Sequence, residues 1–430
     1  MRILFVVHQF LPRHVAGTEI YTFHLAKELQ RRGHSVHLFF TEFYEDREQY
    51  RLSRGGYEGL PYFEAVHNHY FASFRRTYQD SDMERLFCEV LDEVRPEIVH
   101  LQHLHLHSIG YIDILEERDL PVVYTLHEFM LMCLRWGQML RPGFVICEGP
   151  EASECAKCAT IYPLPDPAGR PEPREAEQLV HPYLAAVRER ARGIRERLDK
   201  VDLFVSPSVF LRERFIQVGM LRRERILRSD VGMFVEPFEK VRGHSPRNGR
   251  LRVGYVGTIS DYKGVHILVE AFQGIDDPAI ECAIWGDLKT FPDYTEKLLC
   301  MDAPPRLRFM GRFDNGRIAE VLAEIDLLVV PSLWFENSPL VIHEAFLAGV
   351  PVLTGDRGGM AELVEGGRSG LHFRIGDSAD LRAKILRVAR EQGLHERLCA
   401  GFPEVRRIVA DAALSEARYR TLLAGQLPDR

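Results

Sequence analysis

The sequence has no long hydrophobic run and no excess of basic residues. No stretch of eighteen apolar residues occurs in its 430 positions, so a membrane-spanning helix is not expected. The formal net charge is −7, with 55 Lys and Arg against 62 Asp and Glu, which argues against a protein dedicated to nucleic-acid binding. The first residues, MRILFVVHQF, lack a small-residue cleavage site, and we interpret them as a first strand.

Cysteines are too few and too scattered for a disulfide scaffold. Eight occur, four of them isolated along the chain, which is typical of a reducing compartment. We therefore expect a cytoplasmic protein, with peripheral contact at the inner face of the membrane as the only form of membrane association.

The length predicts two domains, because 430 residues exceed one ordinary core. Apolar strand patterns alternate with helical patterns in both halves, which is typical of parallel α/β domains. The polar segment 234–250 contains Pro and Gly and is the best linker candidate. We predict Rossmann-like domains over 1–240 and 241–409, with a last helix over 411–423 that returns residues 410–430 to the first domain.

Two segments of the first domain show no clear period. Residues 42–80 are aromatic and charged, and we predict an irregular excursion there. The cysteine-bearing stretch that ends near residue 173 is also predicted to be loop-like, before a charged helix over 183–199.

The segment 329–360 holds the clearest strand, loop and helix pattern. An apolar run ending at Pro331 predicts a buried strand. Ser338 is a good N-cap, Pro339 suits the first helical position and Gly349 suits the position after the helix.

Glu336 in this loop and Glu344 on this helix have a spacing that suits a nucleotide sugar. The start of a helix is an anion site fit for a diphosphate. Glu344 lies about 9 Å along the axis from the cap, within reach of a ribose, while Glu336 faces the opposite side, where the sugar would lie. By spacing alone, two solvated surface carboxylates would be the better interpretation.

Four ordered segments carry a resemblance to a known family. They are AGTEIYTFHLAKELQRRGHSV, GYVGTISDYKGVHILVEAF, LRFMGRF and VVPSLWFENSPLVIHEAFLAGVPVLTGDRGGMAELVEGGRSGLHF. The first resembles the opening βαβ unit of retaining GT-B-fold glycosyltransferases of the family-4 type (glycosyl transferases group 1), and the others resemble the donor domain of that family. The resemblance covers most of the chain and implies two Rossmann-like domains whose parallel sheets face a cleft.

This resemblance implies a donor site on the second domain. Lys263 matches the basic residue that neutralises the donor diphosphate, and Glu336 and Glu344 match the acidic pair. The diphosphate-facing turn matches five consecutive residues, which are Asn337, Ser338, Pro339, Leu340 and Val341. Gly358 and Gly359 match a glycine pair that lets the chain pass close to the helix start.

Two family positions differ in this chain. Thr258 stands where the family usually has an arginine. We therefore expect Lys263, the helix amides and Arg312 to supply the interactions with the diphosphate. Gly17 matches the second glycine of a G-G-x-E motif, whereas Ala16 replaces the first.

Histidines at strand ends point to the acceptor side. His127 in TLHE matches a family histidine near the reacting sugar, and we assign it a catalytic role with Lys263 and Glu336. His103 is predicted to line the acceptor cleft. If their strand continued, His103, His105 and His107 would share one face and could bind a metal, although structural roles are preferred for the last two.

Four cysteines close in the sequence suggest a structural metal. Cys133, Cys147, Cys155 and Cys158 have the spacing C-x13-C-x7-C-x2-C, which ends in the short chelate typical of structural zinc sites. Four free thiols are the alternative.

The resulting hypothesis is a retaining hexosyltransferase that uses a nucleotide-diphosphate sugar, without a catalytic metal. The acceptor is expected to be a glycan or a lipid-linked precursor in cell-envelope polysaccharide synthesis. Alternatives are a nucleotide-sugar epimerase or phosphorylase of similar fold, and a catalytically silent glycan- or nucleotide-binding subunit.

Overall fold

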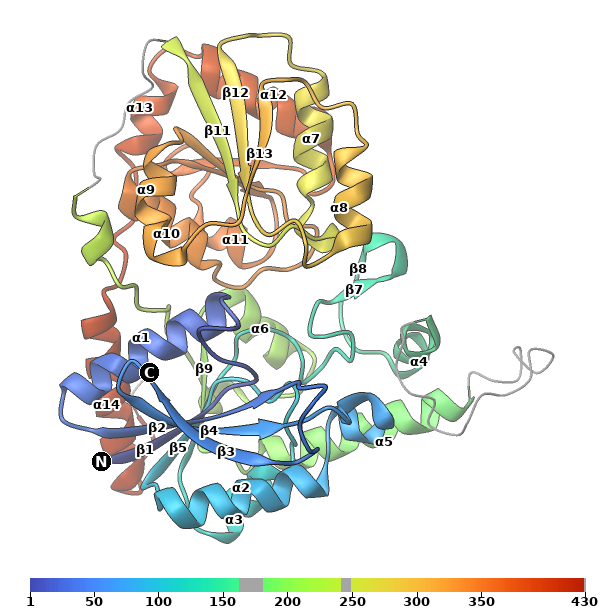
Figure 1. The fold of residues 1–430 in the computed structure, drawn as a ribbon, viewed down its shortest axis with the longest axis vertical. Helices are drawn as coiled ribbons and strands as arrows, with labels where there is room; N and C mark the ends of the chain where they lie inside the picture. Colours follow the sequence, from blue (N-terminus) through green and yellow to red (C-terminus); the bar gives the residue numbers. More distant parts are fainter. Residues whose placement is uncertain (162–180, 241–248, 429–430) are drawn as a thin grey trace. The chain divides into compact units, whose positions relative to one another are not determined.

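The computed structural model describes residues 1–161, 181–240 and 249–428, which form two compact units (Figure 1). Unit 1 comprises Met1–Gly232 and Ile408–Arg430, and unit 2 comprises Met233–Arg407. The chain thus leaves unit 1 at residue 232, against the predicted 240, and re-enters it at residue 408, against the predicted 410.

Unit 1 is built on an eight-stranded sheet with the order β10-β9-β6-β5-β1-β2-β4-β3. All neighbours pair in parallel except β3 and β4. Central strands such as β1 are almost wholly apolar and buried, as expected for a parallel sheet covered on both faces. The strands are β1 (Arg2–Val6), β2 (Ser35–Glu42), β3 (Leu52–Tyr57), β4 (Leu60–Val66), β5 (Ile98–Leu101), β6 (Val122–Thr125), β9 (Leu203–Ser206) and β10 (Ile226–Arg228).

The prediction of an irregular excursion over 42–80 was wrong. Strands β3 and β4 form an antiparallel hairpin, and β4 extends the sheet beside β2. The hairpin turns at Glu58 (φ 51°) and Gly59 (φ 79°), the two left-handed residues of a tight turn. Glu is an unusual residue at the first of these positions, so the turn gave no recognisable sequence signal.

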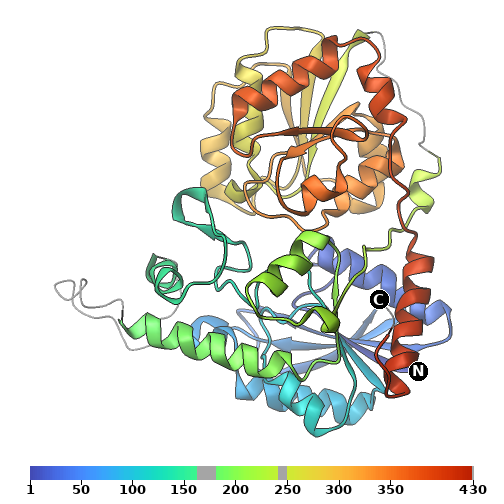
Figure 2. The ribbon, with the colours of Figure 1, turned by 180° about the vertical axis from the view of Figure 1, so that it is seen from behind.

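The helices predicted over 183–199 and 411–423 are present in unit 1, and the cysteine-bearing stretch contains a helix and a small hairpin that were not predicted. Helices α1 and α14 pack side by side in Figures 1 and 2. The α14 carboxylate of Asp411 accepts hydrogen bonds from Tyr21 on α1 (2.8 Å) and from the backbone of Gly232 (3.1 Å). The elements are α1 (Gly17–Arg31), α2 (Ser81–Val94), α3 (Tyr111–Glu117), β7 (Leu140–Arg141), β8 (Val145–Ile146), α4 (Ala152–Ile161), α5 (His181–Leu198), α6 (Val209–Gln217) and α14 (Ile408–Leu423). The part of the cysteine-bearing stretch beyond residue 161 lies outside the described residues.

Unit 2 has a six-stranded parallel sheet with the order β13-β12-β11-β14-β15-β16. Helices α7, α8 and α12 group on one side of this sheet and α9 and α10 on the other (Figures 1 and 2). The strands are β11 (Leu251–Val256), β12 (Ile280–Trp285), β13 (Leu307–Gly311), β14 (Leu327–Val330), β15 (Val352–Gly355) and β16 (Gly370–Phe373). The helices are α7 (Val265–Gln273), α8 (Pro292–Leu299), α9 (Ile318–Ala323), α10 (Leu340–Ala348), α11 (Gly358–Leu363), α12 (Ser378–Arg390) and α13 (Leu394–Cys399).

The strand order of unit 2 has a topological switch point between β11 and β14. From β11 the chain builds the sheet outward through β12 and β13, and then returns to the other side of β11 for β14. Loops that leave adjacent strands at such a point diverge, and ligands bind in the crevice between them. The confirmed fold class is α/β with two Rossmann-like units.

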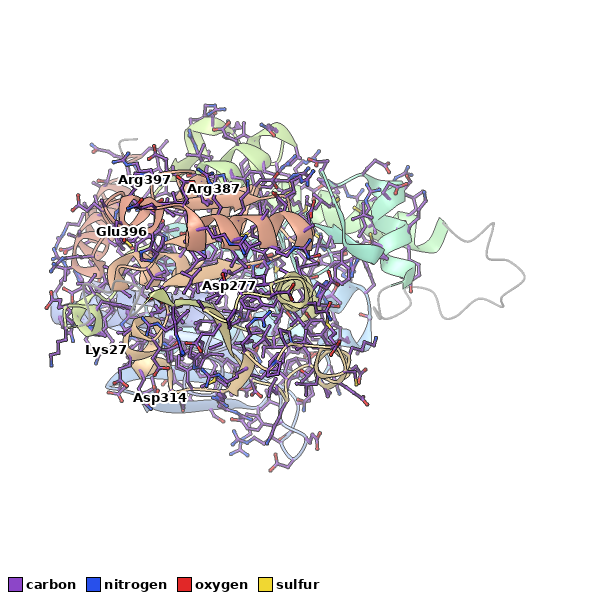
Figure 3. The ribbon with its side chains drawn as sticks, turned by 90° about the horizontal axis from the view of Figure 1, so that it is seen from above. Lys27, Asp277, Asp314, Arg387, Glu396 and Arg397 are labelled. Atoms are coloured by element: carbon purple, nitrogen blue, oxygen red, sulfur yellow. The ribbon has the colours of Figure 1, made fainter. Side chains whose placement is uncertain are left out.

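Surface arginines are engaged by acidic neighbours. Figure 3 labels Arg387 on α12 and Arg397 on α13, both of which donate hydrogen bonds to Glu391, at 2.8 and 2.5 Å. Arg223 likewise pairs with Glu213 at 2.6 Å. Among the helices of the described ranges, none is long and apolar enough to cross a bilayer.

Candidate functional site

The switch point of unit 2 brings Lys263 and Glu336 together. Lys263 lies in the short 3-10 turn after β11, and Glu336 lies in the loop after β14. The Lys263 Nζ donates a hydrogen bond to Glu336 Oε1 at 2.5 Å. The two loops are also joined through their backbones, since the Leu333 amide donates to the Tyr262 carbonyl at 2.9 Å. Two of the three predicted catalytic residues thus meet at the carboxyl edge of one sheet.

Gly264 makes this approach of the two loops sterically feasible. Its φ of 70° is left-handed, and a Cβ at this position would lie 2.1 Å from the Pro331 carbonyl oxygen. The turn that carries Lys263 can therefore pass directly over the end of β14 only with glycine after the lysine.

Glu336 is held by three donors on a single oxygen. Besides Lys263, the Ser332 hydroxyl and the Trp334 indole Nε1 each donate to Oε1 at 2.8 Å. Lys263 Nζ also lies 5.1 Å from the centre of the Trp334 ring. The fixed carboxylate is only 7% exposed, so it is not an ordinary solvated surface group.

The start of α10 differs from the prediction in its cap. The helix runs Leu340–Ala348 with Pro339 at the N-cap position, and Gly349 ends it in a left-handed conformation (φ 80°), as predicted. Ser338 was wrongly predicted as the cap, because its hydroxyl hydrogen-bonds the His343 ring at 2.9 Å. Leu340 and Val341 form the first turn of the helix.

The glycine pair 358–359 packs against the loop that precedes α10. The Gly359 amide donates to the Glu336 carbonyl at 2.7 Å. A Cβ on Gly359 would lie 1.5 Å from the Asn337 carbonyl oxygen, so no other residue fits without moving this loop. The predicted close approach of the chain at this position is therefore present.

Glu344 occupies the buried side of α10. The residue is 8% exposed, and no described residue offers its carboxylate a hydrogen bond or an ion pair. Burial raises the pKa of Glu344 to about 7. A carboxylate kept in such a place without a protein partner is an unmet hydrogen-bond acceptor.

Replacing Glu344 by glutamine is expected to change how stability depends on pH. Because the pKa is raised in the folded state, the folded chain keeps the proton that the unfolded chain loses near its ordinary value of 4.5. Stability is therefore lost as pH rises from that value through about 7, by an amount on the order of 3 kcal/mol. Glu344→Gln is expected to stabilise unit 2 at pH 8 more than at pH 5, measured by calorimetry. An equal effect at both pH values would contradict this, and Glu296→Gln on the exposed face of α8 is the matched control.

Thr258 and Arg312 lie at the same edge of the unit 2 sheet. Thr258 is exposed directly after β11, and its carbonyl accepts a hydrogen bond from the Tyr255 hydroxyl at 2.6 Å. Arg312 is exposed directly after β13. Since β12 separates these two strands, Arg312 stands two strands away from the Lys263 turn.

Unit 1 gathers histidines at its own switch point, between β1 and β5. His8 follows β1 and His103 follows β5, and their ring centres lie 4.4 Å apart. His127, after β6, hydrogen-bonds Gln102 at 2.8 Å. The predicted acceptor residues His103 and His127 therefore share one sheet edge. Strand β5 ends at Leu101, so the alternating strand proposed for the histidines 103, 105 and 107 does not form.

Glu19 anchors this cluster from the first turn of α1, two residues after Gly17. Its Oε1 lies 3.1 Å from His8 Nε2. Burial would raise the pKa of Glu19, but the charge and hydrogen bond of His8, a backbone hydrogen bond and the charge of His14 together hold it below its ordinary value. Ala16 takes the N-cap position of α1 in an extended conformation, and both Ala16 and Gly17 are exposed.

Burial keeps the two predicted acceptor histidines uncharged. It lowers the pKa of His127 to about 3 and that of His103 well below its ordinary value, with the neighbouring His8 adding to both effects. His103 Nδ1 already accepts a hydrogen bond from the His105 amide at 2.9 Å, so these histidines lie at the sheet edge as neutral polar groups.

The four cysteines lie near β7 and β8 and on α4. Cys147 follows β8, and Cys155 and Cys158 lie on α4. Burial raises the pKa of Cys133 to about 12 and also raises the pKa values of Cys155 and Cys158. Within the described ranges, no group of three or more His, Cys, Asp or Glu is arranged to hold a metal ion. Structural zinc stays a prediction without geometric support, for elemental analysis of the purified protein to decide.

Several residues of these sites were missed in the sequence. Trp334 and Ser332 lie within four residues of Glu336, so the segment SLWFE could have suggested a fixed carboxylate. His8 lies two residues after the first strand, as His127 lies two residues after a later one, and this shared position was a signal available in the sequence. Glu19 occupies the glutamate position of the G-G-x-E motif that Gly17 matches, which could have identified it as a site residue.

Models of two families match the chain. Glycosyl transferases group 1 matches residues 250–391, and Glycosyltransferase Family 4 matches residues 15–227. Curated relatives include the N-acetyl-alpha-D-glucosaminyl L-malate synthase of Bacillus anthracis, 24% identical over 89% of this chain and 86% of the relative. The phosphatidyl-myo-inositol mannosyltransferase of Mycobacterium leprae is 28% identical, over 34% of this chain and 39% of the relative.

Solved structures share the fold across nearly the whole chain. The sucrose-phosphate synthase of Thermosynechococcus elongatus superposes with a TM-score of 0.67 at 17% identity, covering 99% of each chain. The Anabaena protein Alr3699/HepE, solved in complex with UDP-glucose, gives a TM-score of 0.60 at 17% identity over 98% of each chain. The two matched family models, the curated relatives and the GT-B structural neighbours together show that this chain belongs to the group 1, family-4 glycosyltransferases.

Proposed function

We propose that the protein transfers a hexosyl unit from a nucleotide-diphosphate sugar, with retention of anomeric configuration, to a glycan or lipid-linked acceptor. The observation that carries the donor side is Glu344, a buried carboxylate on α10 that no described residue satisfies. In this proposal the ribose hydroxyls donate to Glu344, and Glu336 accepts hydrogen bonds from the sugar.

The diphosphate would lie between Lys263 and the start of α10. The ammonium group of Lys263 and the dipole of the helix supply fixed positive potential there, which stabilises the charge on a departing diphosphate. Asn337, Ser338 and Pro339 form the backbone that leads into the helix. In this proposal the leaving diphosphate takes the acceptor proton, so no general base is assigned, and Lys263 with the helix dipole supplies the positive charge that a catalytic metal would otherwise provide.

Relatives support the class of donor and acceptor. Solved structures of similar fold hold UDP-glucose or ADP, and curated relatives are named for an L-malate product and for a phosphatidyl-myo-inositol substrate. For this chain we propose a role in cell-envelope polysaccharide synthesis at the inner face of the membrane. Both family models describe glycosyltransferases, which favours transfer over epimerisation.

A panel of UDP-, GDP- and ADP-sugars is expected to contain a ligand that raises the thermal unfolding midpoint. At a hundred times the dissociation constant, a donor stabilises the chain by about 2.7 kcal/mol. The same donor is expected to be hydrolysed slowly without acceptor, and NMR of the first product formed reports retention. Absence of any shift across the panel, or a shift without turnover, would contradict the proposed activity.

A further inference from the structure

The protein itself binds only one of the two carboxylate oxygens of Glu336. Three donors converge on Oε1, which are the Ser332 hydroxyl and the Trp334 indole Nε1, each at 2.8 Å, and the Lys263 ammonium at 2.5 Å. A carboxylate oxygen offers about two lone pairs to hydrogen-bond donors. Oε1 is therefore saturated and has no capacity left for a ligand.

The other oxygen, Oε2, keeps its whole accepting capacity. Within the described ranges no residue donates a hydrogen bond to Oε2, and the ion pair with Lys263 is made by Oε1. The Glu336 side chain is largely withdrawn from bulk water, and an acceptor in such a place needs a donor. Oε2 is thus the atom of Glu336 that a ligand hydroxyl can satisfy.

The segment that supplies two of the donors is fixed at several points. The Trp334 ring meets the Tyr262 ring edge-on, with the ring centres 5.9 Å apart. The Leu333 amide donates to the Tyr262 carbonyl at 2.9 Å, and the Glu336 amide donates to the Trp334 carbonyl at 3.1 Å. Ser332 is buried. The orientation of the Glu336 carboxylate is therefore set by the fold before any ligand binds.

Glu344 shows the opposite arrangement in the same unit. No described residue donates to either of its oxygens. A carboxylate with both oxygens free can accept from the two hydroxyls of a vicinal diol, one hydroxyl on each oxygen, as proposed above for the ribose. Glu336 has one free oxygen, so only one hydroxyl of a diol can make a well-aligned hydrogen bond to it.

We propose that Glu336 recognises the donor sugar through Oε2 alone, and hence through a single hydroxyl group, with Ser332 and Trp334 as positioning residues that occupy Oε1. It rests on the proposed function, because it names the part of the hexosyl group that this carboxylate contacts. The donor is then a nucleotide hexose in which one hydroxyl, and not a vicinal pair, depends on Glu336.

Monodeoxy donors test this contact with the full chain. The probes are the nucleotide sugar found in the donor screen and its forms that lack the hydroxyl at C2, C3, C4 or C6, which for a UDP-glucose donor are the deoxy forms of UDP-glucose. The measurement is kcat/KM for the slow hydrolysis of each donor without acceptor. Loss of the hydroxyl that contacts Oε2 is expected to lower kcat/KM by roughly 10- to 100-fold, because the acceptor is charged.

Glu336→Gln identifies which of these losses depend on the carboxylate. The donors on Oε1 hold the amide oxygen in its place, so the amide nitrogen takes the position of Oε2, where it cannot accept a hydrogen bond. In this variant the loss at one position is expected to disappear, while the losses at the other positions remain. Disappearance of the losses at two adjacent positions, or at none, would overturn the single-hydroxyl contact.

Trp334→Phe tests the positioning role, because it keeps an aromatic ring beside Tyr262 and removes the N–H donor. It is expected to weaken the discrimination against the sensitive deoxy donor by about three-fold or more, while affinity for the free nucleoside diphosphate stays within about three-fold. A merely structural role would instead lower kcat/KM equally for every donor, and that result would remove Trp334 from this role.

Ser332→Ala provides a second, independent variant should Trp334→Phe not fold. It removes the other neutral donor to Oε1 and is expected to weaken the same discrimination. Thr295→Val, which removes a buried hydroxyl from α8, is the matched control and is expected to discriminate like the wild type. Unchanged discrimination in Ser332→Ala would contradict the assignment of Ser332.

Hydrolysis of the parent donor separates this failure from that of the proposed function. If no nucleotide sugar is hydrolysed, the proposed function fails and the single-hydroxyl contact fails with it. If the parent donor is hydrolysed but Glu336 affects two adjacent hydroxyls or none, the activity stands and only the proposed contact is wrong.

Discussion

Lys263→Ala is expected to lower the rate of sugar transfer by about 10²- to 10³-fold. Lys263 is the one cation that the structure places against Glu336, through a contact of 2.5 Å in the described part of unit 2. Thr258, which stands where the family usually has an arginine, has no charge to offer the diphosphate. The loss of transfer rate is therefore expected to be larger than in a relative that carries a second basic residue at the position of Thr258.

Steady-state kinetics with the donor found in the screen measure this loss. Both kcat and the affinity for the nucleoside diphosphate are expected to fall, because the proposed contact of the lysine with the diphosphate exists in the ground state and strengthens in the transition state. Lys297→Ala, on an exposed part of α8, is the control for a lost lysine in the same unit. A transfer rate like that of the wild type would remove Lys263 from the site.

Glu336→Gln is expected to reduce transfer by about 100-fold or more, with little change in fold. The amide oxygen can still accept from Ser332 and Trp334, which donate to the same atom at 2.8 Å. The lost charge removes the strong acceptor for sugar hydroxyls and the partner of Lys263. Affinity for the free nucleoside diphosphate is expected to stay within about three-fold, because Glu336 is assigned to the sugar.

The double variant tests whether the two residues act as a unit. Groups in direct contact show non-additive effects, so the loss in the double variant is expected to be smaller than the product of the two single losses. Multiplicative losses would show that Lys263 and Glu336 act independently. Glu296→Gln serves as the control for a lost carboxylate.

The strand, loop and helix of residues 329–349 were predictable because they depend on local patterns. The apolar run that forms the strand, Ser338 and Pro339 before the helix, and Gly349 after it each affect the backbone only within a few positions of the chain. The cap was mispredicted because the Ser338 hydroxyl bonds the ring of His343, five residues along the chain on α10, and the helix starts one residue later than expected. The hairpin Leu52–Val66 was missed because a left-handed Glu58 is stabilised by the pairing of β3 with β4 and not by its own preference.

The burial of Arg190 could not be predicted from spacing. The side chain is 6% exposed and donates a hydrogen bond to the Met130 carbonyl, 60 positions away in the sequence. In the sequence, Arg190 belongs to a run of charged residues that is typical of an exposed helix face. Only the packing of α5 turns this one arginine inward while Arg188 stays exposed.

The two crossings of the chain between the units lie close together within each unit. In unit 1, a Cβ on Gly232 would lie 2.9 Å from the Cα of Ile408, and Asp411 bonds the Gly232 amide. In unit 2, the Met233 amide donates to the Arg406 carbonyl at 2.8 Å. Unit 2 is therefore inserted into unit 1, and the first and last residues of unit 2 lie next to each other. The two residues of unit 1 that flank the insertion are adjacent too. Such an arrangement allows unit 2 to be replaced through two adjacent chain connections without rebuilding the core of unit 1.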